Sequence, residues 1–244
     1  MPDLIPSLPI STPCGMNHRS FIYRQLVAAG AHFEEMYGSA VAMDFGDAPS
    51  EDERARNLGI ADLSPLPRVG FRGPGAMQWL ADQGISIEAI PNRAWRQEDG
   101  ALAVARSWTE SLLLSDLEGR SGLCRQLETQ TEEAFAAGAY LLPRADGQFW
   151  FVVTGARASE CLGKLCAIDL RQSRFSDGSV SQTSVARITA VVIRSDIGTT
   201  LSFHILGESV YGEYLWDWIT DAMTEFEGGL IGLSTLRTLS DVIK

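Results

Sequence analysis

Histidine and cysteine are scarce in this sequence, which holds three His and four Cys among 244 residues. None of the three histidines, His18, His32 and His204, stands at a chelating distance from another, which argues against a metal site. Cys161 and Cys166 are close in sequence, but a helix would place them about 140° apart, which is poor geometry for sharing a metal. We therefore expect no metal, and ordinary thiols in a reducing cytoplasm.

Positive charge is also in short supply, with 20 Lys and Arg against 31 Asp and Glu and a net charge of -11. Nucleic acids and anionic membranes attract clustered Lys and Arg, so neither is expected as a partner. No apolar run approaches the roughly 20 residues of a membrane helix. The opening MPDLIPSLPISTP has no cationic region and does not match a signal peptide. Residues 1–17 are expected to form an extended arm that lies on a partner, or else a frayed tail.

Motifs of common catalytic and nucleotide sites are missing as well. GFRGPGAMQWL follows an expected strand and opens a helix, but its glycines do not have the Gly-x-Gly-x-x-Gly spacing. Pro74 also removes an amide donor from this turn. No Ser has the flanking glycines of a nucleophile elbow. His204 lies between apolar neighbours in LSFHIL, which favours a polar strand residue over a catalytic base, so no catalytic residue is predicted.

An ordered series of elements does occur twice. RVGFRGPGAMQWLADQG predicts a strand, a glycine turn and a helix, and WFVVTGARASECLG repeats this order with Gly155 in place of Gly73. Strands such as SVARITAVVIR and an amphipathic helix follow each copy. The copies predict an internally duplicated α+β fold with halves at about residues 60–140 and 145–235, unless the match is one that any α+β chain shows by chance.

The last helix, in YGEYLWDWITDAMTEF, is expected to bury a stripe made of Leu215, Trp218, Ile219 and Met223. The aromatic residues of this segment and of QFWF are expected either at an interface with another chain or in the core.

Several segments resemble the folate-binding aminomethyltransferases, the superfamily of the glycine-cleavage T-protein. They are CAIDLRQSRFSDGSVSQTSVARITAVVIR, SFHIL, GEYLWDWITDAMTEF and, in the first half, ARNLGIADLSPLPRVGFRGPGA. Within that superfamily the sequence looks closest to the sarcosine oxidase gamma subunit family. The resemblance implies a folate-binding-type domain over residues 18–244, with mixed or antiparallel sheets and helices. It would lack the C-terminal barrel of the transferases, because the sequence stops at Lys244.

The resemblance also implies tetrahydrofolate as a ligand, but this sequence departs from the family at residues that serve it. The transferases carry an Asp after a Gly-Gly turn, where EDGALAVAR has Ala101, Leu102 and Ala103 and no acid in the few residues after Gly100. A folate-contacting Glu of the family is replaced by His204. The folate-pocket candidates implied for this sequence are Arg194, His204, Asp62 and Leu66.

Two missing carboxylates argue against independent transfer, because a buried cationic ligand would lose its partners. The resemblance then implies a non-catalytic structural subunit of a heteromeric, flavin-dependent amine oxidase or demethylase of the sarcosine oxidase type. Partner subunits of that heterotetramer would hold FAD, FMN and NAD, demethylate an N-methyl amine and pass the carbon unit to tetrahydrofolate.

Two alternatives remain open at this stage. One is a stand-alone tetrahydrofolate-dependent aminomethyl or methyl transferase with an altered pocket, in which Arg194 holds a carboxylate as a bidentate donor. The other is an iron–sulfur maturation factor of the same superfamily, although the family's reactive-cysteine motif is absent around Cys166.

Overall fold

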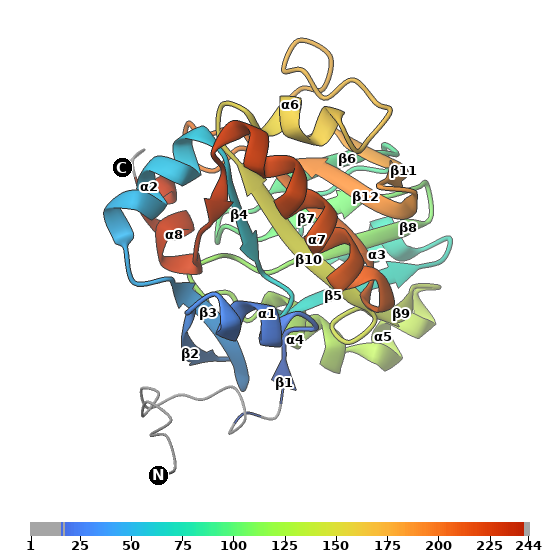
Figure 1. The fold of residues 1–244 in the computed structure, drawn as a ribbon. Helices are drawn as coiled ribbons and strands as arrows, with labels where there is room; N and C mark the ends of the chain where they lie inside the picture. The colour runs from blue at the N-terminus through green and yellow to red at the C-terminus, as the bar shows by residue number, and fades with distance from the viewer. Residues whose placement is uncertain (1–15, 17, 242–244) are drawn as a thin grey trace.

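Two β-sheets packed face to face form the centre of the fold in the computed structural model, which describes residue 16 and residues 18–241 (Figure 1). The six-stranded sheet has the order β11-β12-β13-β10-β4-β14. Its strands are β4 (Gly59–Asp62), β10 (Gln148–Thr154), β11 (Val180–Val185), β12 (Ile188–Arg194), β13 (Ser202–Glu208) and β14 (Gly229–Leu230). All neighbours in it are antiparallel except β14 and β4, which are parallel.

The second sheet has five antiparallel strands in the order β6-β7-β8-β5-β9. They are β5 (Arg68–Arg72), β6 (Arg93–Arg96), β7 (Leu102–Ala105), β8 (Glu110–Leu114) and β9 (Tyr140–Pro143). The prediction of an α+β fold with mixed and antiparallel sheets is therefore confirmed.

Helices cover the outer faces of both sheets. The six-stranded sheet packs against α1 (Tyr23–Ala28), α6 (Ala158–Gly163) and α7 (Gly212–Met223), and the five-stranded sheet against α3 (Ala76–Asp82), α4 (Leu123–Thr129) and α5 (Thr131–Ala136). A third sheet, of β1 (His18–Arg19), β2 (His32–Met36) and β3 (Ser39–Asp44), lies beside these layers with α2 (Ala48–Asn57) and α8 (Leu233–Asp241) (Figure 1). Short 3-10 turns, η2 (Ser209–Tyr211) and η3 (Thr224–Phe226), flank α7.

Strand β10 shows how the sequence fits these layers. Every residue of QFWFVVT is buried, because the strand is covered on both faces and needs no polar alternation. Phe149 and Phe151 belong to the core under α7, whereas Trp150 and Val152 belong to the core between the two sheets. QFWF therefore serves the core, one of the two roles expected for it.

The two glycine turns predicted from the repeat make the same contacts. Gly73 and Gly155 join a strand to a helix with φ of 140° and 106°. A Cβ at Gly73 would lie 2.1 Å from the Gly138 carbonyl oxygen, and one at Gly155 would lie 2.4 Å from that of Asn57. Each carbonyl belongs to the segment just ahead of a strand, β9 for Gly138 and β4 for Asn57. Glycine is thus required at both turns by backbone conformation and by close approach.

The stripe predicted on the last helix is wrong at one position. Leu215, Ile219 and Met223 are buried, but Trp218 is 46% exposed, and Trp216 is buried in its place. The reason is that α7 packs its Trp216 side against Phe151, with ring centroids 5.1 Å apart.

Of the predicted N-terminal arm, residues 1–15 and 17 lie outside the described residues, as does Cys14. The other three cysteines are buried free thiols, as expected. Among the described residues, no helix is both long and apolar enough to cross a membrane.

Candidate functional site

Arg194, the first folate-pocket candidate, makes its hydrogen bonds to other residues of the protein. Its Nε and Nη2 donate to the two carboxylate oxygens of Asp196 at 3.0 and 2.6 Å, and its Nη1 donates to the Phe175 carbonyl at 2.8 Å. The side chain is 8% exposed. This bidentate pair uses the edge of the guanidinium that a ligand carboxylate would need. Arg194 instead links the end of β12 to the segment ahead of β11.

His204, the second candidate, is buried between the two sheets. Its Nδ1 accepts a hydrogen bond of 3.0 Å from Nε1 of Trp150. Burial lowers the pKa of His204 to about 3, and the charge of Arg96 adds to this effect. The imidazole is therefore neutral near pH 7 and its acceptor nitrogen is in use, so it is not a general base. The interpretation of His204 as a polar strand residue agrees with this environment.

Asp62 and Leu66 are buried at the end of β4 and in the loop after it. Asp62 accepts a hydrogen bond of 3.0 Å from the Ser64 amide, and burial raises the pKa of its carboxyl group despite nearby Ser20, Ser64 and Arg68. Leu66 is fully buried in the core between the sheets.

The structure does not bring the four candidates together. Strand register places Asp62 in line with Phe151, on the face covered by α7, whereas His204 lies in line with Val152 on the opposite face. Arg194 shares the face of Asp62, but β13 and β10 separate their strands, which corresponds to about 14 Å across the sheet. These residues do not line a common pocket.

The space between the two sheets is filled in this protein. Side chains from both sheets form one apolar core there, which includes Leu102, Val104, Leu112, Leu114, Trp150, Val152, Val191, Ile193 and Leu206.

A buried carboxylate does lie beside the Gly100 turn, although not at the expected place in sequence. Asp116 is 1% exposed, and a Cβ added to Gly100 would lie 3.4 Å from its own Cβ. Its oxygens accept from the amides of Arg120 and Ser121 at 2.9 and 3.0 Å. Asp116 is therefore a loop-capping residue, and the alanines after Gly100 are buried. Sequence reasoning missed Asp116 because it lies in the loop after β8 and not in the residues directly after Gly100.

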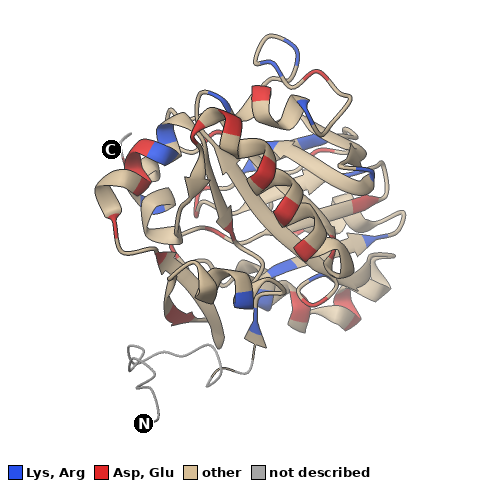
Figure 2. Ribbon diagram, in the orientation of Figure 1, with Lys and Arg blue, Asp and Glu red and all other residues tan. Residues whose placement is uncertain are grey.

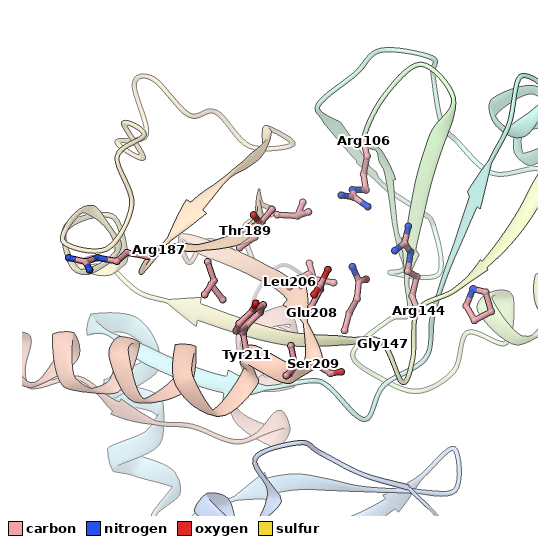
Figure 3. A pocket seen from close by; sticks show the side chains of 16 residues that line it. Arg106, Arg144, Gly147, Arg187, Thr189, Leu206, Glu208, Ser209 and Tyr211 are labelled. Carbon is pink, nitrogen blue, oxygen red and sulfur yellow. The ribbon is translucent and has the colours of Figure 1, made fainter.

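A cavity of about 740 Å³ opens elsewhere, where the ends of β12 and β13 face the β9–β10 turn (Figure 3). Arg106 and Arg144 reach into it from the five-stranded sheet and Glu208 faces them from β13, whereas Arg187 points away. Nη1 of Arg106 and Nη2 of Arg144 donate to the same oxygen, Oε1 of Glu110, at 2.5 and 3.0 Å. None of the four predicted candidates lines this cavity.

The chemistry of this cavity is suited to binding. The lining combines the arginine donors with the hydroxyl-bearing residues Thr189, Ser209 and Tyr211 and with the apolar Val191 and Leu206. Its described lining holds no His, Cys or Lys that could serve as a nucleophile or base. Sequence reasoning missed Arg106 and Arg144 because 38 positions separate them and each looks like an ordinary arginine at a strand end.

The fold of two packed sheets with outer helices is similar to that of two solved structures. A chain of heterotetrameric sarcosine oxidase from Corynebacterium sp. U-96, in complex with pyrrole 2-carboxylate, matches with a TM-score of 0.61 and 21% identity, over 74% of this chain and 93% of that chain. Glycine cleavage system aminomethyltransferase T from Bartonella henselae matches with a TM-score of 0.71 and 14% identity, over 91% of this chain and 61% of the transferase.

This protein therefore spans about three fifths of that transferase. At these identities the likeness establishes the fold. No family model matches the sequence, and no curated protein matches it.

Proposed function

We propose that this chain is a non-catalytic subunit of a heteromeric, flavin-dependent amine oxidase of the sarcosine oxidase type, in the role of its gamma subunit. Oxidation of the N-methyl amine and one-carbon transfer to tetrahydrofolate would take place in partner subunits. The observation that carries the proposal is the filled space between the two sheets, which leaves the folate-binding fold without a folate-sized hollow at its centre.

The state of the candidate residues supports the same role. Arg194 is paired with Asp196, and His204 accepts from Trp150. Both polar groups are thus satisfied within the protein, and binding folate would require breaking these contacts. The matched chain of the Corynebacterium oxidase is covered over 93% of its length, so the similarity extends over nearly all of one chain of a heterotetramer.

An exposed aromatic face on α7 offers a surface for a partner. Tyr211, Tyr214 and Trp218 are 43%, 40% and 46% exposed, and the rings of Tyr214 and Trp218 lie 6.1 Å apart. Aromatic residues are enriched at protein interfaces, where they bury much area at low entropic cost. Figure 2 shows acidic positions along α7, namely Glu213, Asp217 and Asp221, so the complementary surface would be apolar with a basic rim.

The test is purification of the tagged chain from its source cells, followed by native mass spectrometry and flavin absorbance. We expect a flavoprotein complex, and its loss in the double variant Tyr214→Ser with Trp218→Ser. Phe135→Ser is the matched control, because Phe135 is 69% exposed on α5, which covers the other sheet. Recovery of the chain alone from these cells would contradict the proposal.

The alternative of a stand-alone tetrahydrofolate-dependent transferase is tested on the purified chain. A ligand that binds the native state raises its melting temperature by mass action. We expect no shift with tetrahydrofolate, because the hollow is filled. A shift that Arg194→Met abolishes would favour the transferase.

We also propose that the fold is internally duplicated, with halves near residues 60–140 and 145–235. Support comes from the strand orders β6-β7-β8-β5-β9 and β11-β12-β13-β10-β4, which correspond position by position. Equivalent hydrogen bonds accompany them: Gly73 and Gly155 donate to Thr109 and Leu201, just ahead of β8 and β13. In this arrangement β4, at the start of the first half, pairs in the six-stranded sheet, and β9, between the two halves, pairs in the five-stranded sheet.

A further inference from the structure

The cavity between β9 and β12–β13 gathers positive charge in an otherwise acidic protein. The chain carries a net charge of -11, yet Arg106 and Arg144 share one oxygen of Glu110. Arg72 is close enough to act electrostatically on Arg144. A single carboxylate therefore pairs with two guanidinium groups, and a third acts on one of them electrostatically, in a chain with an acidic surplus.

Repulsion between these guanidinium groups raises the electrostatic free energy of the site when no further anion is bound. Burial lowers the pKa of Arg144, and the charge of Arg106 lowers it further, against the opposing effect of Glu110. The side chains of Arg106 and Arg144 are only 18% and 20% exposed, so water screens their repulsion incompletely. An anion in the cavity would relieve this repulsion.

Donor groups remain available for such an anion. Nη2 of Arg144 donates to Glu110, but its Nη1 has no hydrogen-bond partner among the described residues. Arg106 is held in place by Glu110 through Nη1 and by Gln182 through Nη2, at 3.0 Å. Gly70 leaves room for Arg144, because a Cβ there would lie 3.0 Å from its Nε. The guanidinium pair is thus positioned before any ligand arrives.

The rest of the cavity indicates the class of ligand. Glu208 faces the arginines, so the charges of Arg106 and Arg144 are balanced by those of Glu110 and Glu208, while Arg187 points away from the cavity (Figure 3). That balance favours a monoanion over a dianion. Val191 and Leu206 supply apolar side chains to the lining on the face between the sheets, and the volume of about 740 Å³ is typical of small-molecule sites.

We propose that this cavity is a binding site for a small organic monocarboxylate with an apolar body, whose carboxylate is held by Arg144 and Arg106. The apolar body would lie over β12 and β13, with the hydroxyl groups of Thr189 and Tyr211 at the far end. The site is separate from the position of the four folate-pocket candidates, and it does not depend on the proposed subunit role.

The test uses 1-naphthoate as the probe and ligand-observed saturation-transfer NMR with calorimetry on the whole chain. 1-Naphthamide is the neutral control and inorganic phosphate the dianionic one. We expect naphthoate to bind, and naphthamide and phosphate to bind about tenfold more weakly or less. Arg144→Gln should weaken naphthoate at least about tenfold, since it removes a charge-assisted hydrogen bond. Arg174→Gln is the matched control, because Arg174 is exposed outside the cavity.

Thr189→Trp supplies a second variant that keeps every charge and fills the cavity from an exposed position. It should also abolish naphthoate binding, and it tests whether naphthoate binds in this cavity if Arg144→Gln does not fold. Equal binding of naphthoate and naphthamide, tighter binding of phosphate, binding that survives Thr189→Trp, or no binding of naphthoate at millimolar concentration would each overturn the proposal.

Discussion

Nε1 of Trp150 donates to Nδ1 of His204 at 3.0 Å, across two adjacent strands and in the core between the sheets. Both side chains are at most 5% exposed. Each polar nitrogen of this pair satisfies the other, so two polar groups are accommodated where the fold would otherwise need apolar ones.

His204→Leu should lower the free energy of unfolding by about 1–3 kcal/mol, because it leaves the Trp150 donor buried without an acceptor. Urea unfolding measures the loss. In a double-mutant cycle with Trp150→Phe, a coupling of about 1 kcal/mol is expected. Strictly additive single losses would show that the hydrogen bond contributes nothing.

The stability of the protein should also depend on pH through His204. Its pKa is about 3 in the folded state, against 6.5 for the free side chain, so the unfolded state binds the proton more readily between these values. Stability is therefore full above pH 6.5 and falls as the pH drops towards 3, by up to about 1.4 kcal/mol per unit.

The burial of Asp62 raises its carboxyl pKa and contributes a slope of the opposite sign, which should persist in His204→Leu. Urea unfolding at several pH values in wild type and His204→Leu isolates the histidine part as the difference. If the difference in unfolding free energy between wild type and His204→Leu does not change with pH, the predicted role of His204 in the pH dependence is wrong.

Arg194→Met should destabilise the protein by about 2–4 kcal/mol, because it leaves Asp196 and the Phe175 carbonyl without their donor. Arg171→Met is the matched control. Arg171 also pairs with an Asp two residues away, Asp169, but its side chain is 75% exposed, so a much smaller loss is expected. Chemical unfolding of both variants measures the contrast, and equal losses would contradict the linking role of Arg194.

Gly155→Ala and Gly73→Ala should each cost more than about 2 kcal/mol, because both residues have positive φ and a Cβ would meet a carbonyl oxygen. Gly163→Ala, at the end of α6 with no atom within 4 Å of an added Cβ, should be neutral or stabilising by up to about 1 kcal/mol. Thermal or urea unfolding ranks the three variants. If Gly155→Ala behaves like Gly163→Ala, the turns are not constrained as described.

Local features of the sequence were informative where short-range physics decides the structure. Gly73 and Gly155 mark turns that only glycine can form, and the patterns around them predicted the strand and helix on either side. The α7 stripe was right at Leu215, Ile219 and Met223 and wrong at Trp218, because which edge of an amphipathic helix is covered depends on its neighbour.

The candidate residues show that local sequence patterns do not predict which distant residues lie together. Asp62, Arg194 and His204 were grouped through the resemblance to folate-binding proteins, and strand register then separated them onto two faces of one sheet. Arg106 and Arg144 went unnoticed, although the structure places both guanidiniums on one carboxylate oxygen.

The amino-acid sequence by itself determined the element order, the glycine turns and the acidic character of this protein, since each follows from residues near in the chain or from composition alone. Only the tertiary structure decided that the space between the sheets is filled and that an arginine pair borders a cavity elsewhere. The physical reason is that both depend on packing between segments far apart in sequence, where strand register and side-chain volume choose which groups meet.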